Sequence, residues 1–257
     1  MKIAILIPST TKQRDWECIT QTYLYKSIIS FTGKCNPDYQ YKFYIGVDTD
    51  DKIYSRQDEK NKIYALCKDL NVGIQFYPID KNDHNGFLTH IWNIIYKKAI
   101  EEKNDYFFIA GDDIIYMSDG WLDNCINALT KTKGVGAAGI FNGNGRILTQ
   151  FLITKKHYDI FGYAYHPHIK NWGCDDVMHY TYAPSFLHIC QGQAINAGGD
   201  PRYEIDFSYK EKIESIIKQE RDKLLYYINS NGGLSYYIGN KGGEKKRTKS
   251  RKPDKAN

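Results

Sequence analysis

The sequence predicts an α/β fold, one domain built on a mostly parallel sheet. Short apolar segments rich in β-branched and aromatic residues alternate with longer segments of helical periodicity, which is the pattern of βαβ units. Acidic residues directly follow two of the apolar segments, at the strand end where open α/β sheets bind ligands. The length of 257 residues leaves room for a single large domain and a tail.

The first elements form a βαβαβ run. They are strands over 2–7, 41–47 and 74–78 and helices over 17–31 and 57–70. A helix over 87–103 follows, because its apolar residues recur at helical spacing. It leads into a buried strand over 106–110 and then into a helix with Asp119 as N-cap and Gly134 at its end. We expect irregular loops from 139 to 173.

The composition is that of a folded soluble protein, with 42% hydrophobic and 25% charged residues. Six cysteines stand far apart without a Cys-x-x-Cys pair, which argues against a zinc cage or a dense disulfide framework. No apolar stretch approaches the length of about eighteen residues that a membrane span needs. The apolar run after Met1 ends within six residues and is a first core strand rather than a signal peptide. We expect a cytoplasmic protein.

The positive charge is concentrated at the C-terminus. Residues 244–257 contain seven Lys or Arg residues against two acidic ones, so this segment accounts for the formal net charge of +5. We predict a domain over 1–207, a helix over 208–232 packed on it, and a basic, disordered tail over 233–257. The tail is either simply solvated or loosely attracted to acidic surfaces. The remaining body lacks a basic stripe, which argues against specific binding of nucleic acid.

The most informative motif is a pair of adjacent acids, Asp112 and Asp113, after the strand over 106–110. Two like charges raise each other's pKa unless a cation or hydrogen-bond donors hold them ionised. A divalent cation that carries phosphate oxygens meets this requirement. We therefore expect the pair to hold Mn²⁺ or Mg²⁺ against a diphosphate.

A second acidic cluster follows the strand over 41–47. Asp48, nearest the strand, is a candidate to accept hydrogen bonds from a nucleobase or ribose, with a turn as the alternative. For Asp50 and Asp51 we expect a turn or a helix cap. The segment 134–139 matches the dinucleotide fingerprint G-x-G-x-x-G, but it follows a helix and leads into a β-like stretch, so we assign it no cofactor.

A third acidic pair, Asp175 and Asp176, follows an aromatic loop and opens a short helix. Helix capping alone would account for carboxylates there. The functional alternative is a general base, because a carboxylate beside an aromatic wall has a raised pKa and can take a proton from an attacking hydroxyl. Tyr163, Tyr165 and Trp172 suit stacking on a sugar ring.

Two cations are candidates for contact with a diphosphate. Arg202 carries a guanidinium, which binds phosphate bidentately, and Lys170 carries an ammonium, which acts as a point charge. Solvated surface cations are the alternative.

Taken in order, these motifs resemble those of GT-A fold glycosyltransferases, nearest to the family 2 type. The resemblance covers roughly the first two hundred residues and rests on short motifs at 5–10, 85–93, 105–106, 111–113 and 173–176. It implies a Rossmann-like three-layer α/β sandwich with a mixed, mostly parallel central sheet. It also implies that Pro8, Ser9 and Thr10 form the nucleotide loop and that Asp48 lies near the base or ribose.

The resemblance implies further roles in catalysis. Asp112 and Asp113 match the D-x-D metal region with Gly111 in place of the first acid, so Asp113 is the expected direct ligand. Asp175 and Asp176 resemble a Glu-Asp pair whose second member is commonly the base of inverting enzymes, which assigns the base to Asp176. His188 is a candidate third metal ligand, with a structural histidine as the alternative.

The expected activity is that of a metal-dependent, inverting glycosyltransferase (EC 2.4, hexosyltransferase-like). It would move a sugar from a nucleotide-diphosphate donor, a UDP-sugar by preference, to a hydroxyl of a glycan or other acceptor. Two alternatives stay open. A sugar nucleotidyltransferase would share the metal chemistry, although segment 9–14 lacks the Gly of a phosphate loop. A noncatalytic carbohydrate- or nucleotide-binding relative would explain the missing acid at Gly111.

Overall fold

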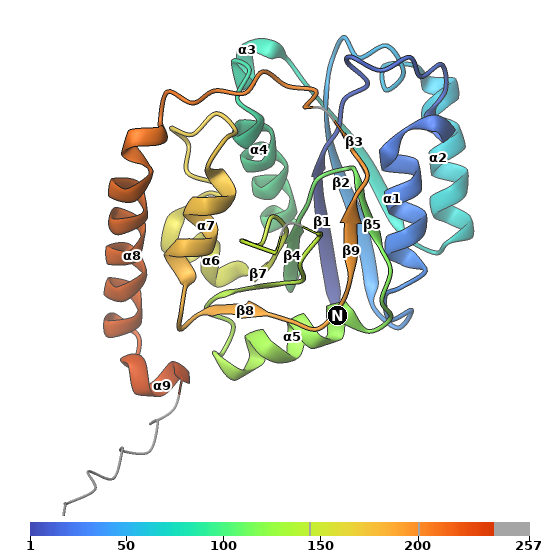
Figure 1. Cartoon of the computed structure of the whole chain (residues 1–257). Helices are drawn as coiled ribbons and strands as arrows, with labels where there is room; N and C mark the ends of the chain where they lie inside the picture. Colours follow the sequence, from blue (N-terminus) through green and yellow to red (C-terminus); the bar gives the residue numbers. More distant parts are fainter. Residues whose placement is uncertain (144, 200, 239–257) are drawn as a thin grey trace, which may run out of the picture.

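A mixed sheet lies at the centre of the computed structural model, which describes residues 1–143, 145–199 and 201–238 (Figure 1). Its seven strands are β1 (Lys2–Pro8), β2 (Gln40–Asp48), β3 (Gly73–Ile79), β4 (Tyr106–Ile109), β6 (Ala137–Gly139), β7 (Phe151–Thr154) and β8 (Leu187–Ile189). They are ordered β3-β2-β1-β4-β7-β6-β8, and β7 alone runs antiparallel to its neighbours in this sheet as described. A separate antiparallel ribbon pairs β5 (Ile114–Tyr116) with β9 (Ala194–Asn196).

Helices cover both faces of the sheet. One face carries α1 (Tyr23–Thr32), α2 (Gln57–Asp69) and α5 (Trp121–Lys131) together with the β5–β9 ribbon. The opposite face carries α4 (Leu88–Glu101), α6 (Lys155–Phe161), α7 (Cys174–Tyr182) and α8 (Ile213–Ser230). The short elements are η1 (Ile19–Gln21), α3 (Lys81–His84), η2 (Lys210–Lys212) and α9 (Leu234–Ile238). The predicted three-layer sandwich with a mixed, mostly parallel sheet is confirmed.

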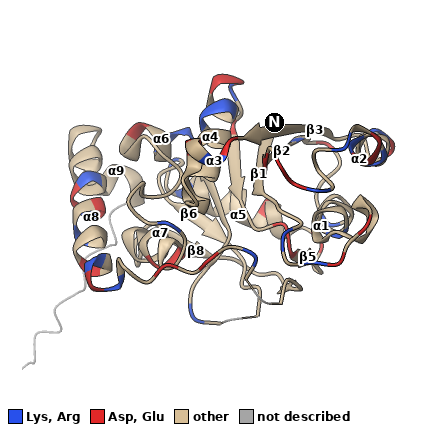
Figure 2. Ribbon diagram, turned by 90° about the horizontal axis from the view of Figure 1, so that it is seen from above, with Lys and Arg blue, Asp and Glu red and all other residues tan. Residues whose placement is uncertain are grey.

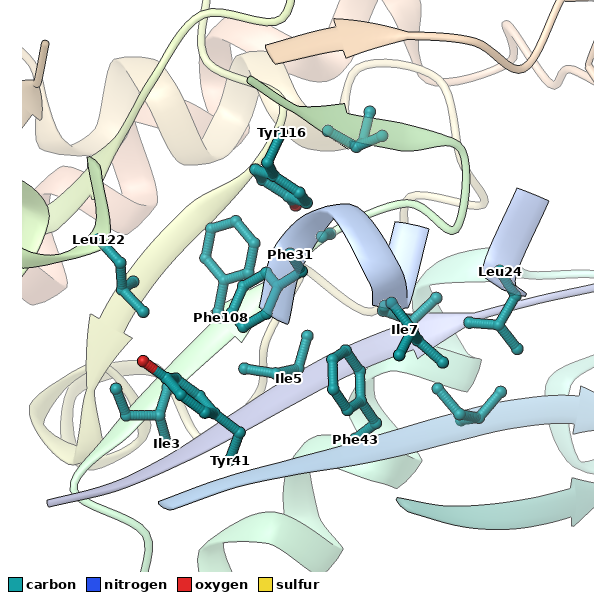
Figure 3. Packing of buried hydrophobic residues seen from close by; sticks show 14 of the residues in the cluster. Ile3, Ile5, Ile7, Leu24, Phe31, Tyr41, Phe43, Phe108, Tyr116 and Leu122 are labelled. Atoms are coloured by element: carbon teal, nitrogen blue, oxygen red, sulfur yellow. The ribbon is translucent and has the colours of Figure 1, made fainter. Parts of the chain in front are cut away.

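The core beneath α1 is aromatic (Figure 3). The ring of Phe31 on α1 lies 5.6 Å from that of Phe43 on β2, 5.9 Å from that of Phe108 on β4 and 5.4 Å from that of Tyr116 on β5. Such edge-on or tilted contacts add to the gain from burial. They fix β5 against the sheet, and with it the short acidic loop that joins β4 to β5.

Several predicted boundaries shift for local reasons. The helix predicted over 17–31 is a short η1 turn and then α1, because the Thr22 side chain caps α1 by accepting from the Tyr25 amide at 3.3 Å. The expected cap at Asp119 is wrong: α5 begins after Gly120, whose φ is 67°, and Asp119 pairs with Lys34. The segment 134–139 leads into strand β6, which confirms that its glycines do not open a helix.

The C-terminal helix packs on the sandwich through Ile216, Leu224 and Ile228 of α8, which are buried against the α6 and α7 side of the core. The predicted tail starts too early, since α9 occupies 234–238 and buries Tyr237. The basic segment 244–257 lies outside the described residues. Over the part of the chain that the structure describes, none of the helices has the length and apolar character required to cross a bilayer.

Candidate active site

One edge of the sheet collects the carboxyl ends of β1, β2 and β4. Because β7 runs antiparallel to β4, the residues just before β7 meet the same edge. A cavity of about 320 Å³ lies here, and Figure 2 views the edge from above. Its wall is built from the segments after β1 and β4, before β7, at the start of α7 and after β9.

The segment after β9 closes the cavity on one side. We call residues 197–199 and 201–206 the strap, and Figure 1 shows this connection crossing the top of the sheet toward α8. The Arg14 guanidinium donates to the Gly198 carbonyl at 2.8 Å, and the Asp206 amide donates to Asn171 Oδ1 at 3.1 Å. A Cβ at Gly198 would lie 1.9 Å from Asp113 Oδ2. The strap therefore passes so close to Asp113 that only glycine fits there.

Arg202 of the strap binds Asp112 with both of its terminal nitrogens. Nη1 donates to Oδ2 at 2.7 Å, and Nη2 contacts Oδ1. The Arg202 side chain is 10% exposed and that of Asp112 is 2% exposed, so the pair is almost fully buried. Nη1 also donates to the Thr10 carbonyl at 3.0 Å, and the Ser9 hydroxyl donates to Asp112 at 2.5 Å. The carboxylate of Asp112 is thus occupied by protein groups.

Asp113 is differently placed. Its carboxylate is 20% exposed and lines the cavity, and Arg202 Nη2 lies 3.8 Å from its Oδ2. Burial, together with the charge of Asp112, raises the pKa of Asp113 to about 6 against the lowering effect of Arg202. A carboxylate with a raised pKa that faces a cavity is suited to receive a cation.

The fit of a divalent metal can be judged from these oxygens. Within residues 1–143, 145–199 and 201–238, no three His, Cys, Asp or Glu side chains gather as a metal site. Mg²⁺-type ions are nonetheless commonly held by one or two carboxylates plus substrate phosphates. Asp113 fits that arrangement, whereas Asp112 does not, because Arg202 takes both of its oxygens.

The end of β1 and the loop after it, which the resemblance makes the nucleotide loop, form part of the cavity wall. Pro8 and Thr10 line the cavity, and the Ser9 amide donates to the Gly46 carbonyl at 2.9 Å. Asp51 links this loop to the turn after β2. It accepts a hydrogen bond from the Thr11 amide at 2.7 Å and another from the Tyr54 amide at 3.0 Å. The predicted turn role of Asp51 is confirmed.

Asp48 is buried at the end of β2. Its Oδ2 contacts Lys12 Nζ, and its Oδ1 lies 2.9 Å from His84 Nε2. The His84 ring accepts from the Gly86 amide at 3.1 Å, which orients it toward Asp48. Asp48 stands outside the cavity wall as the described residues form it. Its role toward a base or ribose stays a prediction.

The two acids of the third pair, Asp175 and Asp176, lie in different environments. Asp175 lines the cavity, and the Tyr165 hydroxyl donates to its Oδ1 at 3.0 Å. Burial raises the pKa of Asp175 to about 7, against the lowering effect of that hydrogen bond. Asp176 is instead paired with Arg146, whose Nη1 lies 2.7 Å from Oδ1. Of the two, Asp175 has the position and the acidity of a general base.

Two residues singled out from the sequence, His188 for the metal and Lys170 for the diphosphate, do not line the cavity as the described residues form it. His188 is on β8, where its Nε2 lies 3.3 Å from the Thr132 hydroxyl, so the structure does not bring it to the cavity wall formed by the described residues. This position corrects the sequence-based expectation that His188 is a third metal ligand beside Asp113. Lys170 Nζ lies 3.7 Å from Glu204 of the strap.

The aromatic residues divide between the cavity and the core. Trp172 lines the cavity, is 37% exposed and lies 5.1 Å from the ring of Phe207. Tyr165 is buried beneath Asp175. Tyr163 points elsewhere, since its hydroxyl bonds Glu220 of α8 at 2.9 Å. Only Trp172 of these three offers an exposed ring at the cavity in the described structure.

The sequence did not reveal the part of the cavity wall that lies just before β7. Thr149 and Gln150 line the cavity, together with Asn142. The sequence predicts an irregular loop here, although the apolar run of β7 directly follows Gln150. A polar residue at the edge of such a run was the available signal.

Comparison with known proteins supports the fold. Neither a family model nor a curated protein matches the sequence. Among solved structures, the chain is similar to S. aureus TarS, a glycosyltransferase with a GT-A-like fold. For TarS 1–349 in complex with UDP, the TM-score is 0.50 and the identity 12%, covering 89% of this chain and 71% of that one. For the complex with UDP-GlcNAc, the values are 0.51 and 11%, covering 89% and 72%. The likeness shows a GT-A-like fold.

Proposed function

We propose that this protein is a glycosyltransferase that moves a sugar from a nucleotide-diphosphate donor to an acceptor hydroxyl. One observation carries the proposal: a single cavity contains Asp175, a carboxylate with a pKa near 7, and also a second carboxylate, Asp113, beside the cation Arg202. Group transfer from a diphosphate needs both charge stabilisation for the leaving group and a proton acceptor. The fold agrees, since the similar TarS structures contain UDP and UDP-GlcNAc.

At the donor end, Arg202 is the residue that binds the diphosphate. Its guanidinium is held by Asp112 and by the Thr10 carbonyl, so it is oriented before the donor arrives. Asp113 would hold Mn²⁺ or Mg²⁺ beside the diphosphate. Such an ion, when bound, neutralises charge that develops on the leaving group. UDP is the expected nucleotide.

At the acceptor end, Asp175 acts as the general base. It takes the proton of the acceptor hydroxyl while that oxygen bonds to the anomeric carbon and the bond from this carbon to the diphosphate oxygen breaks. A single displacement of this kind inverts the anomeric centre, which is our reason for proposing an inverting, hexosyltransferase-like enzyme of class EC 2.4. The assignment differs from the sequence-based expectation of Asp176, because Asp176 is held by Arg146. Trp172 is the candidate surface for an acceptor, such as a glycan.

The test is a product analysis with nucleotide sugars in the presence of Mn²⁺ and, in parallel, with EDTA. We expect release of UDP, slowly to water and faster when an acceptor is present, and we expect Asp175→Asn to lose both reactions. Pyrophosphate as the product would identify a nucleotidyltransferase instead. Binding of UDP-sugars without turnover under any of these conditions would identify a noncatalytic relative.

A further inference from the structure

A buried amide in the cavity wall has an oxygen without a hydrogen-bond partner among the described residues. Gln150 is 1% exposed and lines the cavity just before β7. Its Nε2 donates to the Thr149 hydroxyl at 3.1 Å, whereas its Oε1 has no hydrogen-bond partner among the described residues. A buried acceptor without a partner lowers the stability of the folded protein. Such a group calls for an explanation, and a ligand of the cavity that donates a hydrogen bond supplies one.

The position of Gln150 along the sheet edge indicates which part of the donor it meets. The strands follow one another in the order β2, β1, β4, β7, so the edge presents Asp48, then Ser9, then Asp112, then Gln150. Phe151 pairs with Ile109, which sets Gln150 beside the loop that carries the acidic pair. With the diphosphate at Arg202, as proposed above, and the nucleoside taken to lie at β2 and β1, the end of the edge at β7 is left for the sugar.

The charged side chains of the cavity wall favour a neutral donor sugar over an acidic one. Among the described residues of the cavity wall, Arg202 is the one cation, and it is bonded to Asp112. The other charged side chains of that wall are acids, namely Asp112, Asp113 and Asp175. Because Arg202 and an ion at Asp113 would be engaged by the diphosphate, the carboxylate of an acidic sugar would face these acids at a cost in electrostatic energy. A neutral sugar meets no such penalty.

We propose that Gln150 selects the donor sugar: its amide oxygen accepts a hydrogen bond from a hydroxyl or amide N–H of an uncharged hexose. This inference rests on the proposed function and deepens it. A site that hydrogen-bonds a substrate hydroxyl discriminates strongly against the analogue that lacks it, because the buried group then stays unpaired. The unpaired oxygen of Gln150 thus has two opposite effects: it lowers the stability of the free protein, and it raises the affinity for the sugar.

The experiment compares Gln150→Met with the wild type. Methionine keeps the length of the side chain and removes the unpaired acceptor. Binding is measured calorimetrically with UDP, UDP-glucose, UDP-galactose, UDP-GlcNAc and UDP-glucuronic acid, and thermal unfolding is recorded without ligand. We expect an unfolding temperature of the free variant equal to or above that of the wild type. We also expect unchanged affinity for UDP and a 10–100-fold loss for the preferred uncharged UDP-hexose.

Control variants distinguish a role of Gln150 in sugar binding from an unspecific effect of the substitution. Gln75→Met, at an exposed position of β3, is expected to change none of these values. Gln150→Asn keeps the amide on a shorter side chain and is also expected to lose affinity for the UDP-hexose. This variant replaces Gln150→Met in the experiment if the Met variant does not fold. In the wild type, one deoxy analogue of the preferred donor is expected to bind 10–100-fold less tightly, and Gln150→Met should abolish that difference.

Three results would overturn the inference. The first is full affinity of both Gln150 variants for every UDP-hexose. The second is an equal loss for UDP and UDP-hexose, which would mean that Gln150 supports the nucleotide or the fold. The third is a wild-type preference for UDP-glucuronic acid. If the wild type binds neither UDP nor any UDP-sugar, the proposed function itself fails, and the inference falls with it.

Discussion

Arg202 spans the two carboxylate oxygens of Asp112, with Nη1 2.7 Å from Oδ2 and Nη2 in contact with Oδ1. The contact joins the strap to the loop after β4, at the floor of the cavity. Because the same guanidinium lies 3.8 Å from Asp113, one interaction both closes the strap and sets a cation beside the second acid. The stability of the strap and the binding of a diphosphate are therefore coupled through a single residue.

Removing Arg202 should destabilise the protein. Arg202→Met leaves Asp112 buried without a counter-ion, and breaking a buried pair in this way costs about 3–5 kcal/mol. Urea unfolding measures the change. The double variant Arg202→Met with Asp112→Asn should recover most of it, since the uncompensated charge is gone. Lys98→Met is the control, because Lys98 pairs with Glu101 on the exposed surface of α4, where loss of an ion pair has little effect on stability. A double variant no more stable than Arg202→Met alone would contradict this account.

The two neighbouring acids of α7 should differ in catalysis. Asp175→Asn removes the proposed base and should lower kcat by about 10²–10⁴-fold without changing the affinity for UDP. Asp176→Asn releases Arg146 but leaves Asp175 in place, so a loss of less than about tenfold is expected for an exposed ion pair. Steady-state kinetics and calorimetry on the matched variants decide the matter. The reverse ranking would return the base to Asp176.

Activity should depend on the ionisation of Asp175. Only the carboxylate form can take a proton, so kcat/KM should rise as pH increases through about 7 and level off above it. In Asp175→Asn this limb of the profile should be absent from the residual activity. An unchanged inflection near pH 7 in the variant would assign the titration to another group.

Stability should show the opposite trend with pH. The folded pKa of Asp175, about 7, lies above the ordinary value near 3.9, so the folded state favours the protonated form. The stabilisation is complete below about pH 4 and is lost as pH rises through about 7. Asp175→Asn should thus be more stable than the wild type at pH 8, by roughly 2–4 kcal/mol, and equal to it at pH 4. Urea unfolding at both pH values checks the difference. Equal stability at pH 8 would mean that Asp175 ionises without a burial penalty.

Metal dependence should reside in Asp113. Mn²⁺ is expected to increase the affinity for UDP, EDTA to reverse the increase, and Asp113→Asn to abolish it. His188→Ala should respond to Mn²⁺ as the wild type does, because His188 lies beside Thr132 on β8. Calorimetric titration of UDP with and without Mn²⁺ measures each case. A wild type that binds UDP and turns over equally well in EDTA would remove the metal from the proposal.

The acidic pair of α7 illustrates where sequence reasoning stopped. The sequence shows two adjacent carboxylates at the start of a helix, and a rotation of about 100° per residue points them in different directions. Asp175 shares helical spacing with Met178 and Tyr182, which are buried against the core, and this turns it toward the cavity. Gln150 shows a different limit. The short strand β7 was not recognised, so its polar neighbour could not be placed.

The alternation of apolar strands with amphipathic helices was sufficient, by itself, to predict the layered α/β fold and the sheet edge that carries the acids, because apolar periodicity and strand polarity are local properties of the chain. The partners of those acids depend on segments far apart in the sequence. Arg202 meets Asp112 across ninety positions, and β7 reaches β4 in an antiparallel direction. Only the packing of the helices and of the strap brings these groups together, since a charged side chain has no sequence pattern that reveals which distant group will neutralise it.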